Sequence, residues 1–185
     1  MNTEQHFLSL PESLFETSAV ADFAGDIAVS DITMGADRYR FSTPVHYRLF
    51  ITNTGGALLV TGTVSGTAHT ACARCLDDMD LVLDAEVEAY YVIPGEDASL
   101  SEDEEVEYET LEGKDKIDLD ALVRAALALA FPYIPLCTED CAGLCSQCGA
   151  NLNRETCECV IEEPDDSNNP FAVLKALKFD EESKS

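Results

Sequence analysis

Residues 137–159 read CTEDCAGLCSQCGANLNRETCEC and contain six of the eight cysteines of this chain. Thiolates placed this close together suit a tetrahedral site for a soft metal ion far better than they suit a hydrophobic core. The other two cysteines, Cys72 and Cys75, form a separate C-x-x-C motif upstream. The stretch therefore predicts that bound metal replaces part of the core and decides how this end of the chain folds.

The strongest local signal is Cys145-Ser-Gln-Cys148 followed directly by Gly149. Two thiolates at this spacing hold one metal ion while backbone N–H groups donate to the sulfurs, and the glycine permits the turn that this requires. Two partitions of the ligands remain open: two sites of four thiolates each, which we favour because no thiol is left over, or a single local site. The favoured sets are Cys145, Cys148, Cys157 and Cys159, and Cys72, Cys75, Cys137 and Cys141; the single site would use Cys137, Cys141, Cys145 and Cys148.

The expected metal is zinc rather than an iron–sulfur cluster, with one or two ions per chain. A zinc ion with four thiolates has no open position, so such a site stabilises a fold and carries out no reaction. His69, three residues before Cys72, is a further candidate ligand, although its threonine-flanked, strand-like setting is more typical of a surface histidine.

Other uses of these cysteines fit less well. The N-terminal residues MNTEQHFLSLPESLFE have neither the basic nor the continuous apolar segment of a signal peptide, so a cytoplasmic location is expected, where disulfides are rare. A redox-active C-x-x-C begins a helix, whereas residues 81–93, which follow Cys72 and Cys75, alternate as a strand does. No nucleophile–base pair or phosphate-binding glycine loop is evident. A thiol oxidoreductase or an RNA-processing hydrolase is therefore the alternative, not the leading hypothesis.

Upstream of the cysteines the sequence alternates with a period of two. Residues 45–52 and 81–93 read as strands, and in residues 57–70 valine and glycine alternate with threonine and serine, so one face of that strand is hydroxylated. At 118–131 apolar residues recur at helical spacing, with Asp118 or Asp120 as the cap and Pro132 after the end. The predicted class is α+β: an antiparallel sheet body, one main helix, a metal-stapled element and a short terminal helix.

The predicted organisation has four parts. They are an irregular N-terminal segment, 1–22, with a helical turn near Pro11; a β-rich domain, 23–131, with an acidic loop at 96–112 and the helix at 118–131; the cysteine-rich element, 132–160; and an acidic linker with a short helix opened by Pro170, 161–185.

The formal charge of −25 argues against nonspecific binding of nucleic acid or an anionic membrane by the molecule as a whole. Residues 38–76, however, contain no Asp or Glu. The simpler interpretation of this acid-free stretch is a β-region with Thr and Ser facing outward; the functional one is a local contact for RNA or an acidic partner. The candidate contact residues are Arg38, Arg40, Arg48 and Arg74.

Three stretches carry a resemblance to a known family. Residues 60–76 run V-x-G-x-V-x-G into CARCL, residues 118–137 read DLDALVRAALALAFPYIPLC, and the cysteine stretch at 137–159 is followed by a Pro-x-x-x-Leu-Lys-x-Leu segment at 170–177. In these stretches the chain resembles the YceD family, the large ribosomal RNA subunit accumulation proteins.

The resemblance implies a non-enzymatic bacterial factor that supports accumulation or processing of large-subunit (23S) ribosomal RNA and ribosome assembly. The implied partners are the large-subunit ribosomal RNA precursor, basic ribosomal proteins, or both. The strongly acidic charge fits a protein that contacts basic ribosomal proteins by charge complementarity better than a free-standing RNA binder. An acidic protein-binding module for basic ribosomal proteins is accordingly a further alternative.

Overall fold

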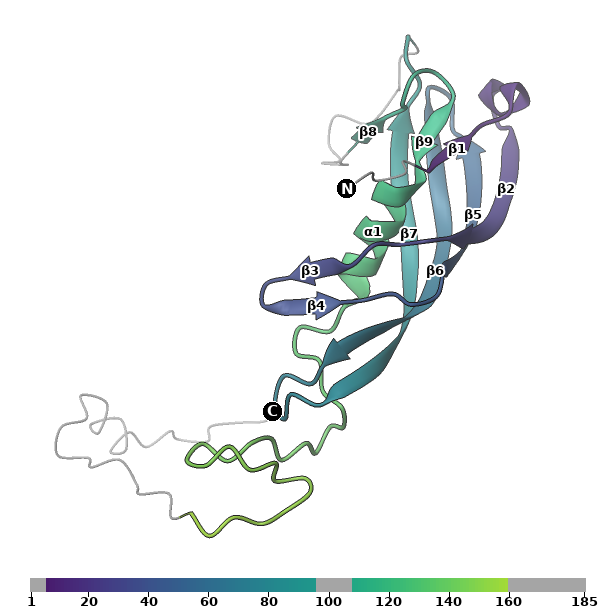
Figure 1. The fold of residues 1–185 in the computed structure, drawn as a ribbon. Coiled ribbons are helices and arrows are strands. Elements are labelled where there is room, and N and C mark those ends of the chain that lie inside the picture. Colours follow the sequence, from purple (N-terminus) through teal and green to yellow (C-terminus); the bar gives the residue numbers. More distant parts are fainter. Residues whose placement is uncertain (1–5, 96–107, 160–185) are drawn as a thin grey trace, which may run out of the picture. The chain divides into compact units, whose positions relative to one another are not determined.

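A computed structural model describes residues 6–95 and 108–159 and divides the chain into two compact units, Met1–Cys141 and Ala142–Ser185. Every helix and strand that the structure describes belongs to the first unit (Figure 1). The division falls inside the element that we predicted at 132–160, between Cys141 and Ala142. Most of the predicted acidic loop and the predicted terminal helix lie outside the described residues.

The first unit is built on a five-stranded sheet in the order β2-β5-β6-β7-β8 (Figure 1). Its strands are β2 (Val20–Ile27), β5 (Val45–Asn53), β6 (Ala57–Ala71), β7 (Asp78–Val92) and β8 (Tyr108–Thr110). Neighbouring strands are antiparallel except β7 and β8, which are parallel. The predicted α+β class with an antiparallel sheet body is thus confirmed, and the short strand β8 adds one parallel pairing at the edge.

Shorter elements complete the unit. They are β1 (Phe7–Ser9), the 3-10 helix η1 (Glu12–Phe15), β3 (Ile32–Met34), β4 (Asp37–Tyr39), β9 (Lys116–Asp118) and α1 (Leu119–Ala130). Strands β1 and β9 pair with each other, as do β3 and β4. The helical turn expected near Pro11 is present as η1, but 7–9 and 20–22 are strand where we predicted irregular chain.

The hairpin of β6 and β7 dominates the sheet. Each strand has 15 residues, and they pair without interruption from Ala57 opposite Val92 to Ala71 opposite Asp78. Along β6 the even-numbered residues, such as Val60 and Val64, face the core, whereas Thr63 and Ser65 are exposed. The hydroxylated face predicted from the alternation is therefore confirmed.

Helix α1 covers the inner face of the sheet and packs chiefly on β7 (Figure 1). Asp118 caps it, because its side chain accepts a hydrogen bond of 3.0 Å from the Ala121 N–H. The buried residues of the helix recur at helical spacing: Leu119, Leu122, Val123, Ala126 and Leu127. The helix predicted at 118–131 is confirmed. Within the described residues, no helix is long and apolar enough to cross a membrane.

Gly62 of β6 lies against the neighbouring strand. A Cβ atom added there would stand 2.0 Å from the carbonyl oxygen of Arg48, which is far inside van der Waals contact. A larger residue at position 62 would therefore require the neighbouring backbone to shift.

We expect Gly62→Ala to lower the free energy of unfolding by about 2–3 kcal/mol, because the sheet must distort to admit the methyl group. Urea denaturation measures this. Ser65→Ala, an exposed change in the same strand, should stay within about 0.5 kcal/mol of the wild type. An equally stable Gly62→Ala protein would contradict the close approach.

Candidate metal centres

The first group of four cysteines, which we name tetrad 1, lies in the first unit. Cys72 and Cys75 come from the turn between β6 and β7, and Cys137 and Cys141 come from the segment after α1. All four Sγ atoms lie within 4.8 Å of one another. The Sγ atoms of Cys72 and Cys141 are 3.7 Å apart, as are those of Cys75 and Cys137.

Backbone hydrogen bonds shape the turn that carries the first half of tetrad 1. The Cys72 N–H donates to the Asp77 carbonyl at 2.9 Å, and the Leu76 N–H donates to the Cys72 carbonyl at 2.9 Å. The Ala73 N–H donates to the Pro135 carbonyl at 2.8 Å, which ties the turn to the segment after α1. The segments that precede and follow α1 in the sequence are therefore held together by backbone hydrogen bonds that need no metal ion.

Arg74 joins the two halves of tetrad 1. Its Nη1 atom donates to the carbonyl oxygen of Cys141 at 3.0 Å. This arginine, a candidate RNA contact from the sequence, thus has a structural role beside the cysteines.

The second group, tetrad 2, lies in the second unit and consists of Cys145, Cys148, Cys157 and Cys159. Its four Sγ atoms also lie within 4.8 Å of one another. The Gly149 N–H donates to the Cys145 carbonyl at 2.9 Å, and Gly149 has a φ of 75°, the left-handed conformation that glycine adopts without strain. The sequence predicted this turn from the glycine that follows Cys148.

The spacing of the sulfurs fits a tetrahedral metal ion. With zinc–sulfur bonds of about 2.3 Å, the edges of a tetrahedron of four sulfurs are about 3.8 Å long. A disulfide would instead need about 2.05 Å. The two Sγ–Sγ distances of 3.7 Å in tetrad 1 match the first value, and all eight cysteines are free thiols. Four soft thiols in each group are the donor set that zinc prefers.

Electrostatics favour the thiolate of Cys72 in tetrad 1 when no cation is present. Burial opposes ionisation of Cys72, but backbone hydrogen bonds from Cys75, Cys137 and Arg74 outweigh it and lower its pKa to about 6. The Asp77 backbone favours the Cys75 thiolate, yet burial and the neighbouring thiols raise the pKa of Cys75 to about 12. A divalent cation held by the four sulfurs would favour the thiolate form of each of them.

Tetrad 2 shows the same division. Backbone hydrogen bonds from Cys148 and Gln147 lower the pKa of Cys145 to about 6; the Gln147 N–H lies 3.4 Å from its sulfur. The pKa of Cys159 is raised to about 12, chiefly by its side-chain hydrogen bond with Cys148 and secondly by burial. Each tetrad therefore contains one cysteine, Cys72 or Cys145, whose pKa is lowered and whose thiolate is favoured.

The two groups are the two sets of the favoured partition. Cys137 and Cys141 meet Cys72 and Cys75, so the cysteines of the single-site alternative are divided between the two tetrads. His69 belongs to neither tetrad, because its ring bonds Ser42 and Asp80 instead. That the tetrads bind metal stays a prediction.

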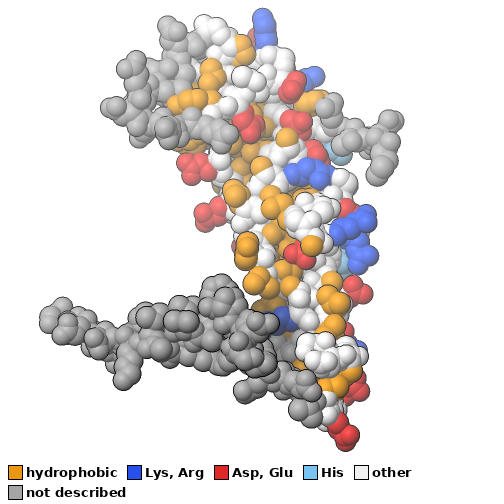
Figure 2. Space-filling view, turned by 90° about the vertical axis from the view of Figure 1, so that its left-hand side faces the viewer, with side chains coloured by type: hydrophobic (Ala, Val, Ile, Leu, Met, Phe, Trp, Pro, Cys, Tyr) orange, Lys and Arg blue, Asp and Glu red, His pale blue; other side chains and the backbone are white. Residues whose placement is uncertain are grey.

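The arginines predicted as contacts do not form a bare basic patch. Arg38 donates twice to Asp31, at 2.9 and 2.5 Å, and Arg40 pairs with Asp78 at 3.6 Å. Arg48 stands on β5 between Ala24 and Thr63 of the neighbouring strands. Figure 2 shows basic and acidic side chains next to each other on one face. An RNA contact through these arginines stays a prediction.

A serine, a histidine and an aspartate form a chain of hydrogen bonds that the sequence did not reveal. Ser42 Oγ lies 2.7 Å from His69 Nε2, and His69 Nδ1 bonds Asp80 Oδ1. The register of β6 and β7 places His69 opposite Asp80, and a β-bridge from His69 to Arg40 brings the Ser42 segment alongside. The order of groups is that of a serine hydrolase triad, although the side chains of His69 and Asp80 are 37% and 67% exposed.

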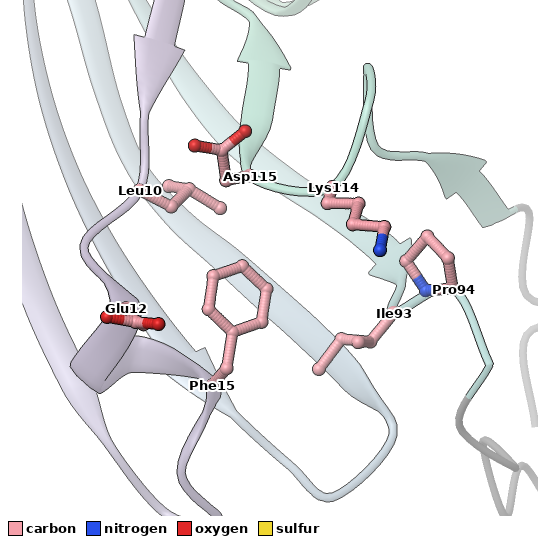
Figure 3. Close-up of a pocket in the computed structure, with 7 residues that line it drawn as sticks. All are labelled: Leu10, Glu12, Phe15, Ile93, Pro94, Lys114 and Asp115. Atoms are coloured by element: carbon pink, nitrogen blue, oxygen red, sulfur yellow. The ribbon is translucent and has the colours of Figure 1, made fainter.

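A cavity of about 520 Å³ lies elsewhere in the first unit (Figure 3). Both apolar and charged side chains line it, and its size falls in the range of small-molecule sites. None of its lining residues is a cysteine. They are Leu10, Glu12, Phe15, Ile93, Pro94, Lys114 and Asp115.

Fold and tetrads together define a cysteine-rich α+β protein with two preassembled four-thiol sites. The chain belongs to the YceD family: the profile described as "Large ribosomal RNA subunit accumulation protein YceD" matches residues 60–178, a range that contains both tetrads.

Related proteins have been curated in bacteria and plants. An uncharacterized protein of Mycobacterium leprae is 26% identical over 112 residues, which are 60% of this chain and 51% of the relative. One of Mycobacterium tuberculosis is 34% identical over 98 residues, 53% of this chain and 46% of the relative. This chain thus spans about half the length of these relatives.

An Arabidopsis thaliana protein named "Large ribosomal RNA subunit accumulation protein YCED homolog 1, chloroplastic" is 35% identical over 60 residues, 32% of this chain and 19% of the relative. No solved structure matches the chain.

Proposed function

We propose that this protein is a non-enzymatic factor that supports accumulation of large-subunit (23S) ribosomal RNA, in the bacterial cytoplasm, during ribosome assembly. Membership of the YceD family carries this proposal. Its partners are then the precursor of the large-subunit RNA, basic ribosomal proteins, or both.

The proposal gives both tetrads a structural zinc ion. Four cysteine ligands close the coordination sphere, so no position is left for a substrate or an activated water. Tetrad 1 would hold Cys72 and Cys75 against Cys137 and Cys141, and tetrad 2 would organise a segment that has little core of its own. The reducing cytoplasm keeps the thiols available for the metal.

The second candidate is hydrolysis at Ser42, which the hydrogen-bond order of Ser42, His69 and Asp80 favours. Acyl transfer draws most of its rate from preorganised oxyanion donors in a water-excluded site, and these three side chains are exposed. We therefore keep the non-enzymatic function.

A fluorophosphonate probe tests the hydrolase directly. We expect no labelling of Ser42 by mass spectrometry under conditions that label a known serine hydrolase completely. Labelling that disappears in Ser42→Ala and falls sharply in His69→Gln would establish a nucleophilic serine and overturn the non-enzymatic function.

The accumulation role is tested in cells that lack the protein. We expect the ratio of mature 23S to 16S ribosomal RNA to fall, with fewer large subunits on a sucrose gradient. The wild-type protein and Ser146→Ala, an exposed change inside the Cys145 turn, should restore the ratio. A 23S level unchanged by loss of the protein would refute the proposal.

A further inference from the structure

The main sheet has one face that nothing in the described chain covers. Helix α1 packs on the inner face, which carries the buried odd-numbered residues of β7, such as Leu83 and Val87. The opposite face, which we name the outer face, carries the even-numbered residues of β7 and their neighbours across β6, β5 and β2. Strand register places these side chains in rows, for example Asp22, Phe50, Thr61 and Glu88.

The outer face of β7 is an acidic row. Successive outward positions are about 7 Å apart along a strand, so these carboxylates form a nearly continuous line. All are exposed, and Val82 is the one outward position from 78 to 88 that is not acidic. The acids of the row are Asp78, Asp80, Asp84, Glu86 and Glu88.

Two of the five acids have a basic partner in the part of the chain that the structure describes. Asp78 pairs with Arg40, and Asp80 bonds His69. The other three acids face hydroxyl side chains on β6. Asp84 lies opposite Ser65, Glu86 opposite Thr63 and Glu88 opposite Thr61. In the described parts of the chain, 6–95 and 108–159, no ion pair to these three carboxylates is formed. Arg48 lies in the same row as Thr63 and Glu86, one strand beyond Thr63, and is the basic residue that the register brings nearest to these acids. The fold therefore keeps like charges side by side, which costs stability.

Apolar and hydroxyl groups lie among the acids. Val82 is 79% exposed, and Phe50 is 46% exposed on the same face. The aliphatic stems of lysine and arginine cover such surface while their charged ends reach carboxylates, and threonine hydroxyls accept their remaining hydrogens. The edge strand β2 adds the acids Asp22 and Asp26.

We propose that the outer face is a docking surface for a lysine- and arginine-rich protein segment. The charge of the face selects this partner and repels the phosphates of RNA. The inference deepens the proposed function and rests on it for the choice of partner: a basic protein of the large ribosomal subunit.

The test uses the full-length protein loaded with zinc and individually purified basic proteins of the large subunit. One triple variant reverses the charge of part of the acidic row: Asp84→Lys, Glu86→Lys, Glu88→Lys. The matched control, Glu102→Lys, Asp103→Lys, Glu104→Lys, makes the same change of formal charge in the acidic stretch of the sequence. Binding is measured by calorimetry at two salt concentrations. A milder variant, Asp84→Asn, Glu86→Gln, Glu88→Gln, serves if the lysines prevent folding.

At least one basic protein should bind, and the row variant should weaken it at least 10-fold while the control weakens it less than 2-fold. Amide NMR signals of β6 and β7 should shift on binding. Three results would each overturn the inference. They are equal weakening by the row and control variants, no binding by any basic protein, and preferential binding of a 23S RNA fragment. These measurements use purified components, so a negative binding result does not contradict the role in 23S accumulation. Conversely, normal 23S levels in cells that lack the protein would not contradict a positive binding result.

Discussion

Removing metal from the native protein is expected to unfold residues 142–159 completely, while the strands of the first unit persist. In this segment the structure describes no helix and no strand, and its backbone pairing includes one isolated β-bridge, Leu144 with Asn151. Such a segment has too little core to offset the entropy of ordering its backbone. Structural zinc supplies about 10–16 kcal/mol of apparent binding free energy in comparable small elements, which is ample.

Hydrogen exchange with and without a strong chelator measures this effect. The amides of Cys145 and Leu152, which donate to backbone carbonyls, should lose all protection, and those of β6 and β7 should keep theirs. Metal analysis should give two zinc ions per chain for the wild type and for Ser146→Ala, and one for Cys148→Ser. Amides of 142–159 that remain protected in a metal-free protein would show that tetrad 2 is not a metal site.

Cys75→Ser in tetrad 1 is expected to destabilise the first unit by about 4 kcal/mol. Cys75 and Cys137 are 62 residues apart in sequence, and a shared metal ion would close this loop as a cross-link does. Loop-closure entropy for about 60 residues corresponds to about 4 kcal/mol at 25 °C. The sheet should survive, because its core lies along β5, β6 and β7 rather than at the tetrad.

Urea denaturation of the zinc-loaded protein measures this loss of stability. The exposed change Ala73→Ser in the same turn is the control and should stay within about 0.5 kcal/mol of the wild type. Metal content should fall from two ions to one, since tetrad 2 is left intact. A loss below about 1 kcal/mol would mean that tetrad 1 does not cross-link the hairpin to the segment after α1.

The long elements follow from local sequence. Strands β6 and β7 were predicted from alternation, because a half-buried strand must place apolar side chains at every second position. Strand β5 was predicted from its β-branched and aromatic residues. Helix α1 was predicted from its 3.6-residue period with Asp118 or Asp120 as the cap, and the structure shows that the cap is Asp118. By contrast, β1, β8 and β9 have three residues each, too few to show a period, and they exist because a distant strand pairs with them.

Local sequence was thus enough to predict the α+β class, the long strands, the hydroxylated face of β6, helix α1 and the turn around Cys145 and Gly149. Each of these depends on residues close together in the chain. The tertiary structure alone decided the grouping of the cysteines, the chain of Ser42, His69 and Asp80, and the pairing of the arginines with acids. Those depend on strand register and on contacts between residues far apart in sequence, which no local pattern of side chains specifies.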